Sequence, residues 1–191
     1  MIEIKNTPKD RALFIDGMCQ GRAAKDGTPL SPYMKPIMER MVPLPKGAEC
    51  LFLGGGLYVL PKWAENRGYS VSVIELDKNV QAAARPFSDS FYMGIGDILE
   101  VLPTLETEWF DFILLDIWPN DPRAYCEEYF RECKAHLKKG GLFAMNYIDN
   151  KRVPLEAMGK IVATVWPNVN MTTFYSDKDL SNPSQGVYFA N

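Results

Sequence analysis

The sequence contains little of what several kinds of catalytic or metal site require. It has one histidine, His136, and four cysteines, which lack the close pairing of a zinc site. A single histidine disfavours both a Ser-His-Asp triad and a histidine-rich zinc centre. We therefore expect no metal site, and we expect the cysteines to be reduced, as is usual in the cytoplasm.

Long apolar runs and an excess of positive charge are also absent. Mean hydropathy is -0.17, and no stretch approaches the roughly 18 apolar residues of a membrane span. The polar residues 1–11 do not resemble a secretory signal. Acidic residues outnumber basic residues by 24 to 21, which argues against a nucleic-acid partner. We expect a cytoplasmic protein without membrane or nucleic-acid partners, in which a cationic small molecule is well tolerated.

The 191 residues show a regular alternation of apolar runs and helical patterns. This alternation predicts an α/β fold with a doubly wound, mostly parallel sheet. In such sheets ligands bind at the edge formed by the carboxyl ends of the strands. The predicted strands are residues 50–53, 71–76, 91–94, 110–116 and 142–148, with a closing pair at 170–175 and 187–190.

The chain is expected to form one structural domain with two parts. Residues 1–45 are predicted to be an N-terminal segment that packs on the core. Within that segment we expect a short strand at 13–15, a loop at 18–32 and a helix at 33–40. The rest of the chain, residues 46–191, is predicted to be the ligand-binding and catalytic part.

Three consecutive glycines, Gly54, Gly55 and Gly56, follow the first central strand. A strand that turns directly into a helix points free N–H groups at a ligand, and glycines allow its close approach. Glu75 ends the next strand about 20 residues later, the spacing at which a carboxylate binds the hydroxyls of a ribose. The pair predicts a nucleoside site, although a tight turn with a solvated acid is the alternative.

The details of the turn favour a nucleoside without a pyrophosphate. The dinucleotide fingerprint requires a small residue where this chain has Val59, and no Lys-Ser/Thr pair follows the glycines. S-adenosylmethionine is the obvious nucleoside of this kind. Asp97 and Ile98 follow a short strand and could bind an adenine, and we include Leu76, next to Glu75, in the site. The alternative for Asp97 is that it caps a short helix.

These segments together resemble a known family. The motifs are "LFLGGG", "VSVIELD", a Gly-Asp pair, "FDFILLD" and "LKKGGLFAMN", and they resemble class I S-adenosylmethionine-dependent transferases. The resemblance is strongest to the spermidine synthase group of aminopropyltransferases, since "LFIDGMCQ" and "QGVYFAN" are similar to its first and last segments. It covers residues 11–191 and implies a Rossmann-like sheet of the class I methyltransferase type, with an antiparallel C-terminal strand.

The resemblance also implies roles for individual residues. Gln20 would contact the nucleoside, Glu75 the ribose and Asp97 the adenine. Tyr33 would lie near the reacting groups. Asp116, at the end of "FILLD", would orient the attacking amine or accept its proton. The implied cosubstrate is S-adenosylmethionine or its decarboxylated form.

Three departures from the family pattern bear on the reaction. The family's glycine turn continues with Asp-Gly, whose acid binds the methionine-derived amine, whereas Leu57 and Tyr58 follow here. The Asp-Pro pair after the catalytic acid comes two places late, as Asp121-Pro122. The family's N-terminal β-domain is expected to be almost absent, because few residues precede "LFIDGMCQ", and this suggests a monomer or homodimer.

The chemistry expected at Asp116 is a displacement at a carbon on a sulfonium. An amine nucleophile must be neutral, so a carboxylate can bind its ammonium form and take the proton. Trp118 and Asp121 would complete an acidic, aromatic acceptor pocket. The structural alternatives are that Trp118 covers the core and that Asp121, with Pro122, starts a helix.

The sequence therefore predicts a spermidine synthase-like transferase that moves an aminopropyl group to a small amine. A small-molecule methyltransferase using S-adenosylmethionine is the first alternative, favoured by the altered glycine turn and the absent β-domain. The second alternative is a non-catalytic nucleoside-binding protein, which would tolerate loss of Asp116.

Overall fold

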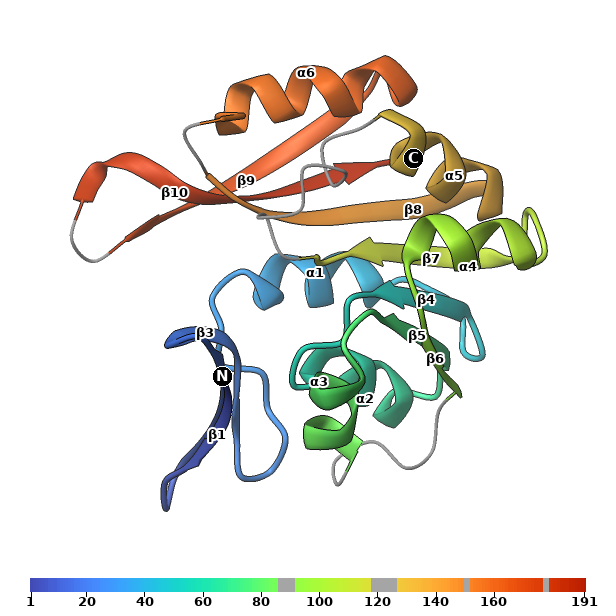
Figure 1. Cartoon of the computed structure of the whole chain (residues 1–191). Helices are drawn as coiled ribbons and strands as arrows, with labels where there is room; N and C mark the ends of the chain where they lie inside the picture. Colours follow the sequence, from blue (N-terminus) through green and yellow to red (C-terminus); the bar gives the residue numbers. More distant parts are fainter. Residues whose placement is uncertain (86–91, 118–126, 150–151, 177–178) are drawn as a thin grey trace.

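The computed structural model describes residues 1–85, 92–117, 127–149, 152–176 and 179–191. Its main feature is a seven-stranded sheet with the strand order β6-β5-β4-β7-β8-β10-β9 (Figure 1). The strands from β6 to β8 are parallel, and β10 is antiparallel to both of its neighbours, as predicted. The strands are β4 (Glu49–Leu53), β5 (Ser70–Glu75), β6 (Tyr92–Ile95), β7 (Phe110–Leu115), β8 (Leu137–Ile148), β9 (Val169–Ser176) and β10 (Asp179–Ala190).

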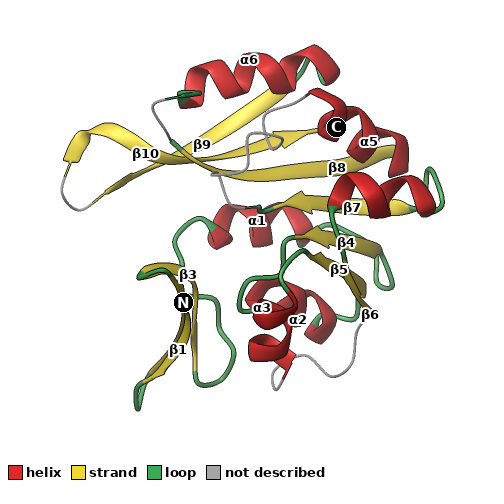
Figure 2. Cartoon of the chain, viewed as in Figure 1, coloured by secondary structure: helices red, strands yellow, loops and turns green. Residues whose placement is uncertain are grey.

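Helices cover both faces of this sheet (Figure 2). One face carries α1 (Met34–Met41), α2 (Val59–Asn66) and α3 (Lys78–Ala84). The other carries α4 (Ile98–Val101), the 3-10 turn η2 (Leu102–Thr104), α5 (Glu127–His136) and α6 (Leu155–Val165). None of the helices in the described ranges is long and apolar enough to cross a membrane.

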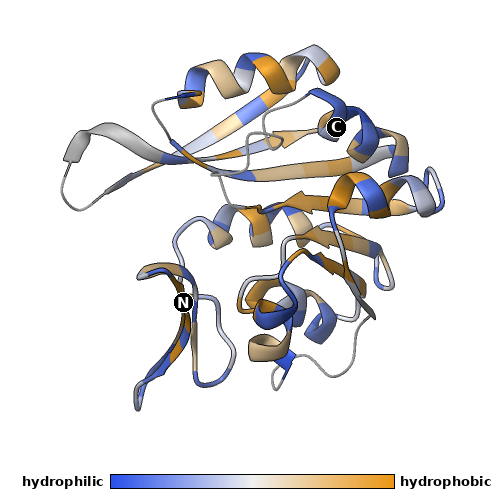
Figure 3. Cartoon of the chain, viewed as in Figure 1, coloured by the Kyte–Doolittle hydropathy of each residue, from blue (hydrophilic) through white to orange (hydrophobic). Residues whose placement is uncertain are grey.

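The central strands are apolar on both sides because each side meets a layer of helices (Figure 3). In β7, Phe112 and Leu114 join the core under α1–α3, whereas Ile113 and Leu115 join the core under α4–α6. All four side chains are buried. The continuous run "FDFILLD" thus reflects a strand that is covered twice, as the sequence predicted.

The N-terminal segment differs from the prediction. Residues 2–24 form a three-stranded antiparallel sheet of β1 (Ile2–Asn6), β2 (Asp10–Ile15) and β3 (Met18–Ala24). The predicted loop at 18–32 is therefore wrong for residues 18–24, and a small β-domain is present. Strand β3 is not predicted from the sequence because "MCQGRAA" lacks both β-branched residues and a clear alternation of apolar and polar residues.

Two further boundaries differ from the expected ones. The helix after the glycine turn is predicted from the sequence to begin at Leu57, but it begins at Val59, because Tyr58 adopts a left-handed conformation. β8 begins at Leu137, so the two glycines at 140 and 141 lie within the strand. In α3, Asp77 is the N-cap, and its Oδ1 accepts a hydrogen bond of 2.8 Å from the Asn79 N–H.

The topology places the site. From β4 the chain moves outward through β5 and β6, and it then returns to the other side of β4 to form β7 and β8. The order reverses at β4, so a ligand-binding crevice is expected outside the carboxyl ends of the strands at this switch point.

Candidate functional site

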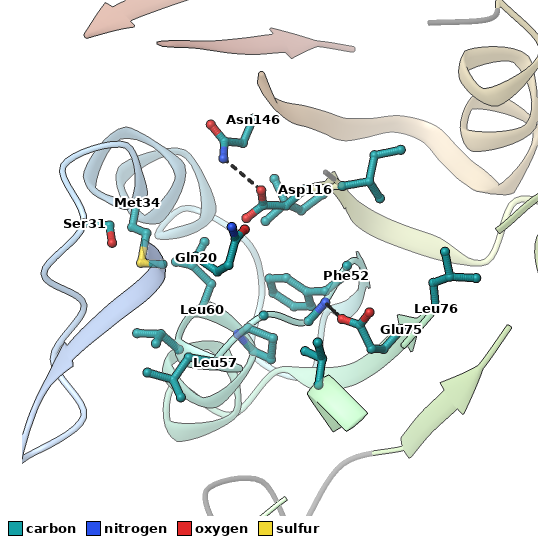
Figure 4. Close-up of a pocket in the computed structure, with 18 of the residues that line it drawn as sticks. Gln20, Ser31, Met34, Phe52, Leu57, Leu60, Glu75, Leu76, Asp116 and Asn146 are labelled. Carbon is teal, nitrogen blue, oxygen red and sulfur yellow. Dashed lines mark hydrogen bonds between the residues drawn. The ribbon is translucent and has the colours of Figure 1, made fainter. Parts of the chain in front are cut away.

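A cavity of about 520 Å³ lies at the carboxyl ends of the parallel strands (Figure 4). The residues that end or directly follow β4, β5 and β7 line it, Asp97 lines it two residues after β6, and β3 and α1 close one side. The structure thus brings ten of the predicted site residues to a single cavity. They are Gln20, Tyr33, Gly54, Gly55, Gly56, Glu75, Leu76, Asp97, Ile98 and Asp116.

The first glycine of the turn lies where no side chain fits. A Cβ on Gly54 would stand 2.0 Å from the carbonyl oxygen of Asp116, and the φ angle of Gly54 is +93°. The close approach arises because Leu53 of β4 pairs with Leu115 of β7, one residue before each of these two positions. Gly54 therefore lets the segments after β4 and β7 come together.

Glu75 holds the turn from the other side. Its Oε2 accepts a hydrogen bond of 2.9 Å from the Gly55 N–H, and its Oε1 accepts one of 3.0 Å from the Asp77 N–H. The sequence predicts that the free N–H groups of this turn bind a ligand. In the structure the Gly55 N–H donates to Glu75, and α2 does not begin until Val59.

The residues predicted to contact an adenine lie at the end of the cavity beside β5 and β6. Asp97 caps α4, since its Oδ1 accepts a hydrogen bond of 3.0 Å from the Leu99 N–H. Ile98 is buried, whereas Leu76 is 60% exposed although it lines the cavity. The capping role of Asp97 is thus present, and its role toward an adenine stays a prediction.

Asp116 is held by hydrogen bonds to both of its oxygens. The Tyr33 hydroxyl, at the start of α1, donates to Oδ2 over 3.1 Å. The Asn146 side chain of β8 donates through Nδ2 to Oδ1 over 2.8 Å (Figure 4). Burial raises the pKa of Asp116 to about 6, even though these two donors lower it and nearby Glu75 raises it slightly further. Asp116 can therefore exchange a proton near neutral pH.

Sequence reasoning missed two residues of this network. Asn146 contacts Asp116 directly, and Gln185 of β10 donates through Nε2 to Asn146 Oδ1 over 2.6 Å. Both residues line the cavity. The only available signal was a polar residue inside the apolar run "LFAMNYI", and nothing in the sequence paired it with residue 185.

The charged groups of the cavity wall share one sign. Within the part of the chain that the structure describes, the charged lining residues are Glu75, Asp77, Asp97 and Asp116. Next to the glycine turn the wall is apolar, because buried Leu57 lies there with Met34 and Leu60 (Figure 4). The described wall therefore favours cationic ligands over anionic ones.

Some predicted features cannot be placed or have a structural role. Trp118 and Asp121 lie outside the described residues. Cys19, Cys50 and Cys133 are free thiols. His136 is buried, and its Nδ1 lies 3.0 Å from the Glu106 carbonyl oxygen. In the described ranges no three His, Cys, Asp or Glu side chains are grouped as a metal site would require.

Solved structures share this architecture. A probable spermidine synthase from Corynebacterium glutamicum has a TM-score of 0.80 at 17% identity, with 99% of this chain and 76% of that chain covered. A spermidine synthase in complex with the transition-state analogue AdoDATO has a TM-score of 0.68 at 19% identity, covering 99% and 73%. This chain has the class I methyltransferase fold.

The same fold is found in a methyltransferase that depends on S-adenosylmethionine, from Archaeoglobus fulgidus. It has a TM-score of 0.65 at 13% identity, with 83% of this chain and 92% of that chain covered. The two spermidine synthases align with 99% of this chain, so their likeness extends over the N-terminal sheet. No family model and no curated protein matches the sequence.

Proposed function

We propose that this chain is an enzyme that binds decarboxylated S-adenosylmethionine and transfers its aminopropyl group to a small amine. The observation that carries this proposal is Asp116, a carboxylate held at both oxygens in a cavity whose described charges are all acidic. Such a group can bind an ammonium and then take its proton.

The cavity suits a nucleoside in size and in chemistry. Its volume of about 520 Å³ lies within the usual range for small-molecule sites. Each oxygen of Glu75 accepts one backbone N–H and keeps capacity for a second hydrogen bond, which a ribose hydroxyl can donate. The exposed side chain of Leu76 lies at the cavity, where the flat face of a base would cover it.

The charge of the wall favours the decarboxylated form of the donor. S-adenosylmethionine carries a carboxylate, which would lie in a cavity whose described charged residues are four acids. The decarboxylated form lacks this group and is more positively charged. Like charges repel strongly where water is partly excluded, so the decarboxylated form is the better fit.

Asp116 would prepare the acceptor. When bound, the donor supplies an electrophilic carbon, whose bond to sulfur breaks with the electron pair remaining on sulfur. With a pKa of about 6, Asp116 is mostly ionised at pH 7 and attracts the acceptor's ammonium. It then takes the proton, so that the nitrogen lone pair is free to form the new bond. Tyr33 and Asn146 keep the carboxylate oriented during this step.

Methyl transfer to a small acceptor is the second candidate, and Leu57 is the observation that favours it. An aminopropyl ammonium needs an anionic partner, but the described wall beside Leu57 is apolar. A departing methyl group needs no such partner. The sequence offered a second reason for methyl transfer, the expected absence of an N-terminal β-domain. That reason no longer applies, because the N-terminal β-sheet is present.

Calorimetric titration with S-adenosylmethionine, its decarboxylated form and methylthioadenosine tests the proposal. We expect all three to bind and the decarboxylated form to bind most tightly. Tighter binding of S-adenosylmethionine would overturn aminopropyl transfer in favour of methyl transfer. If none of the three binds, the nucleoside site itself is wrong.

A further inference from the structure

Gln185 reaches the site from the far end of the chain. It lies on β10, where Val187 pairs with Asn146 of β8 and Gln185 pairs with Ile148. Gln185 is therefore a diagonal neighbour of Asn146, and diagonal neighbours project from the same face of a sheet. This arrangement allows the bond of 2.6 Å from Gln185 Nε2 to Asn146 Oδ1.

The two ends of the Asn146 amide have different hydrogen-bonding roles, because the NH₂ group donates and the oxygen accepts. Its NH₂ group faces Asp116 and donates over 2.8 Å (Figure 4). Its oxygen accepts from Gln185. If the amide were turned around, its oxygen would face the Asp116 carboxylate, and two acceptors would repel. In the structure the Gln185 Nε2 donates to the Asn146 oxygen, and this bond is made only while the Asn146 NH₂ group faces Asp116.

We propose that Gln185 is a positioning residue, which fixes the amide of Asn146 and through it the orientation of the Asp116 carboxylate. This inference rests on the proposed function, in which Asp116 receives the proton of the acceptor. The Tyr33 hydroxyl, just before α1, donates to the second oxygen of the carboxylate, Oδ2. The carboxylate is thus fixed by elements that come from three distant parts of the sequence.

The titration of Asp116 reports on this arrangement. The groups that influence it are Tyr33 on α1, Asn146 on β8 and Glu75 on β5, together with burial. The Asn146 and Tyr33 donors stabilise the ionised form, whereas burial and Glu75 disfavour it. Loss of the Asn146 donor should therefore raise the pKa of Asp116.

The experiment is a carbon-13 NMR titration of the ligand-free protein with labelled aspartate. The Asp116 signal is identified by its loss in Asp116→Asn. We expect Asn146→Leu to raise the pKa of Asp116 by about one pH unit or more, the effect of one charge-assisted hydrogen bond. Gln185→Leu should raise it by a smaller amount, because the freed amide still spends part of its time in the supporting orientation.

A double-mutant cycle separates positioning from a direct effect. If Gln185 acts through Asn146, adding Gln185→Leu to Asn146→Leu changes the pKa of Asp116 no further. Unchanged melting temperatures show that the strand pairing is intact.

The pKa measurements test the role of Gln185 without any measurement of enzymatic activity. An Asp116 signal that titrates identically in wild type and Gln185→Leu overturns the inference, and so does full additivity of the two leucine variants. If the titration shifts as expected but no transferase activity exists, the positioning role stands and the proposed function fails. Where transfer is measured, Gln185→Leu should lower kcat several-fold and leave KM nearly unchanged.

Discussion

Replacing Asp116 by asparagine should stabilise the protein at high pH. The unfolded chain loses the Asp116 proton near pH 3.8, whereas the folded protein keeps it until about pH 6. Between these values the folded state binds more protons than the unfolded state, so stability falls as pH rises through this window. Asp116→Asn removes this loss, because its side chain is neutral at every pH.

The size of the effect follows from the pKa. Raising it from 3.8 to about 6 costs the ionised form about 3 kcal/mol, at about 1.4 kcal/mol per pH unit. This is an upper limit, because Asp116 is only half-buried and water screens the charge. This figure of about 3 kcal/mol already includes the hydrogen bonds from Tyr33 and Asn146, because both bonds contribute to the pKa of Asp116. We expect Asp116→Asn to gain about 1–3 kcal/mol at pH 8 and about half of that at pH 5.

Urea unfolding of wild type and variant at pH 5, 6, 7 and 8 measures this difference. The matched control is Asp111→Asn on the same strand. Asp111 accepts hydrogen bonds of 2.9 Å from the Glu49 N–H and 2.8 Å from Lys138 Nζ, so its removal should destabilise the protein at pH 8. A stability difference between wild type and Asp116→Asn that does not grow from pH 5 to pH 8 would refute the reasoning.

Three further substitutions test the site. Gly54→Ala should destabilise far more than Gly17→Ala, because both glycines have positive φ but only Gly54 faces a backbone oxygen; equal losses in urea unfolding would contradict this. Glu75→Ala should weaken methylthioadenosine binding by about 1.5–3 kcal/mol for each hydrogen bond lost to the ribose, and unchanged affinity in calorimetry would exclude the ribose contact. Leu57→Asp should increase affinity for decarboxylated S-adenosylmethionine more than for methylthioadenosine, because only the former carries an aminopropyl ammonium. An equal change in both affinities would show that the aminopropyl group does not bind beside Leu57.

Much of the fold could be predicted because local pattern and tertiary burial agree. The run "FDFILLD" predicted a strand that the structure shows covered on both faces, and the glycine triplet with Glu75 predicted the edge of the sheet where the cavity lies. Strand β3 could not be predicted in this way. Its residues have weak strand preference, and it is stabilised by pairing with β2 and by burial of Ala23 in the core shared with α1–α3.

The alternating pattern of apolar runs was enough to predict the fold and the residues that end its central strands. A parallel sheet then gathers those ends at one edge. The sequence did not determine the partners of Asp116. Tyr33, Asn146 and Gln185 are joined through the start of α1 and the antiparallel pairing of β8 with β10, and that register depends on the packed sheet as a whole. The polar side chains that hold the carboxylate could not be predicted from the sequence, because these contacts join segments far apart in the chain and form only when the sheet is packed.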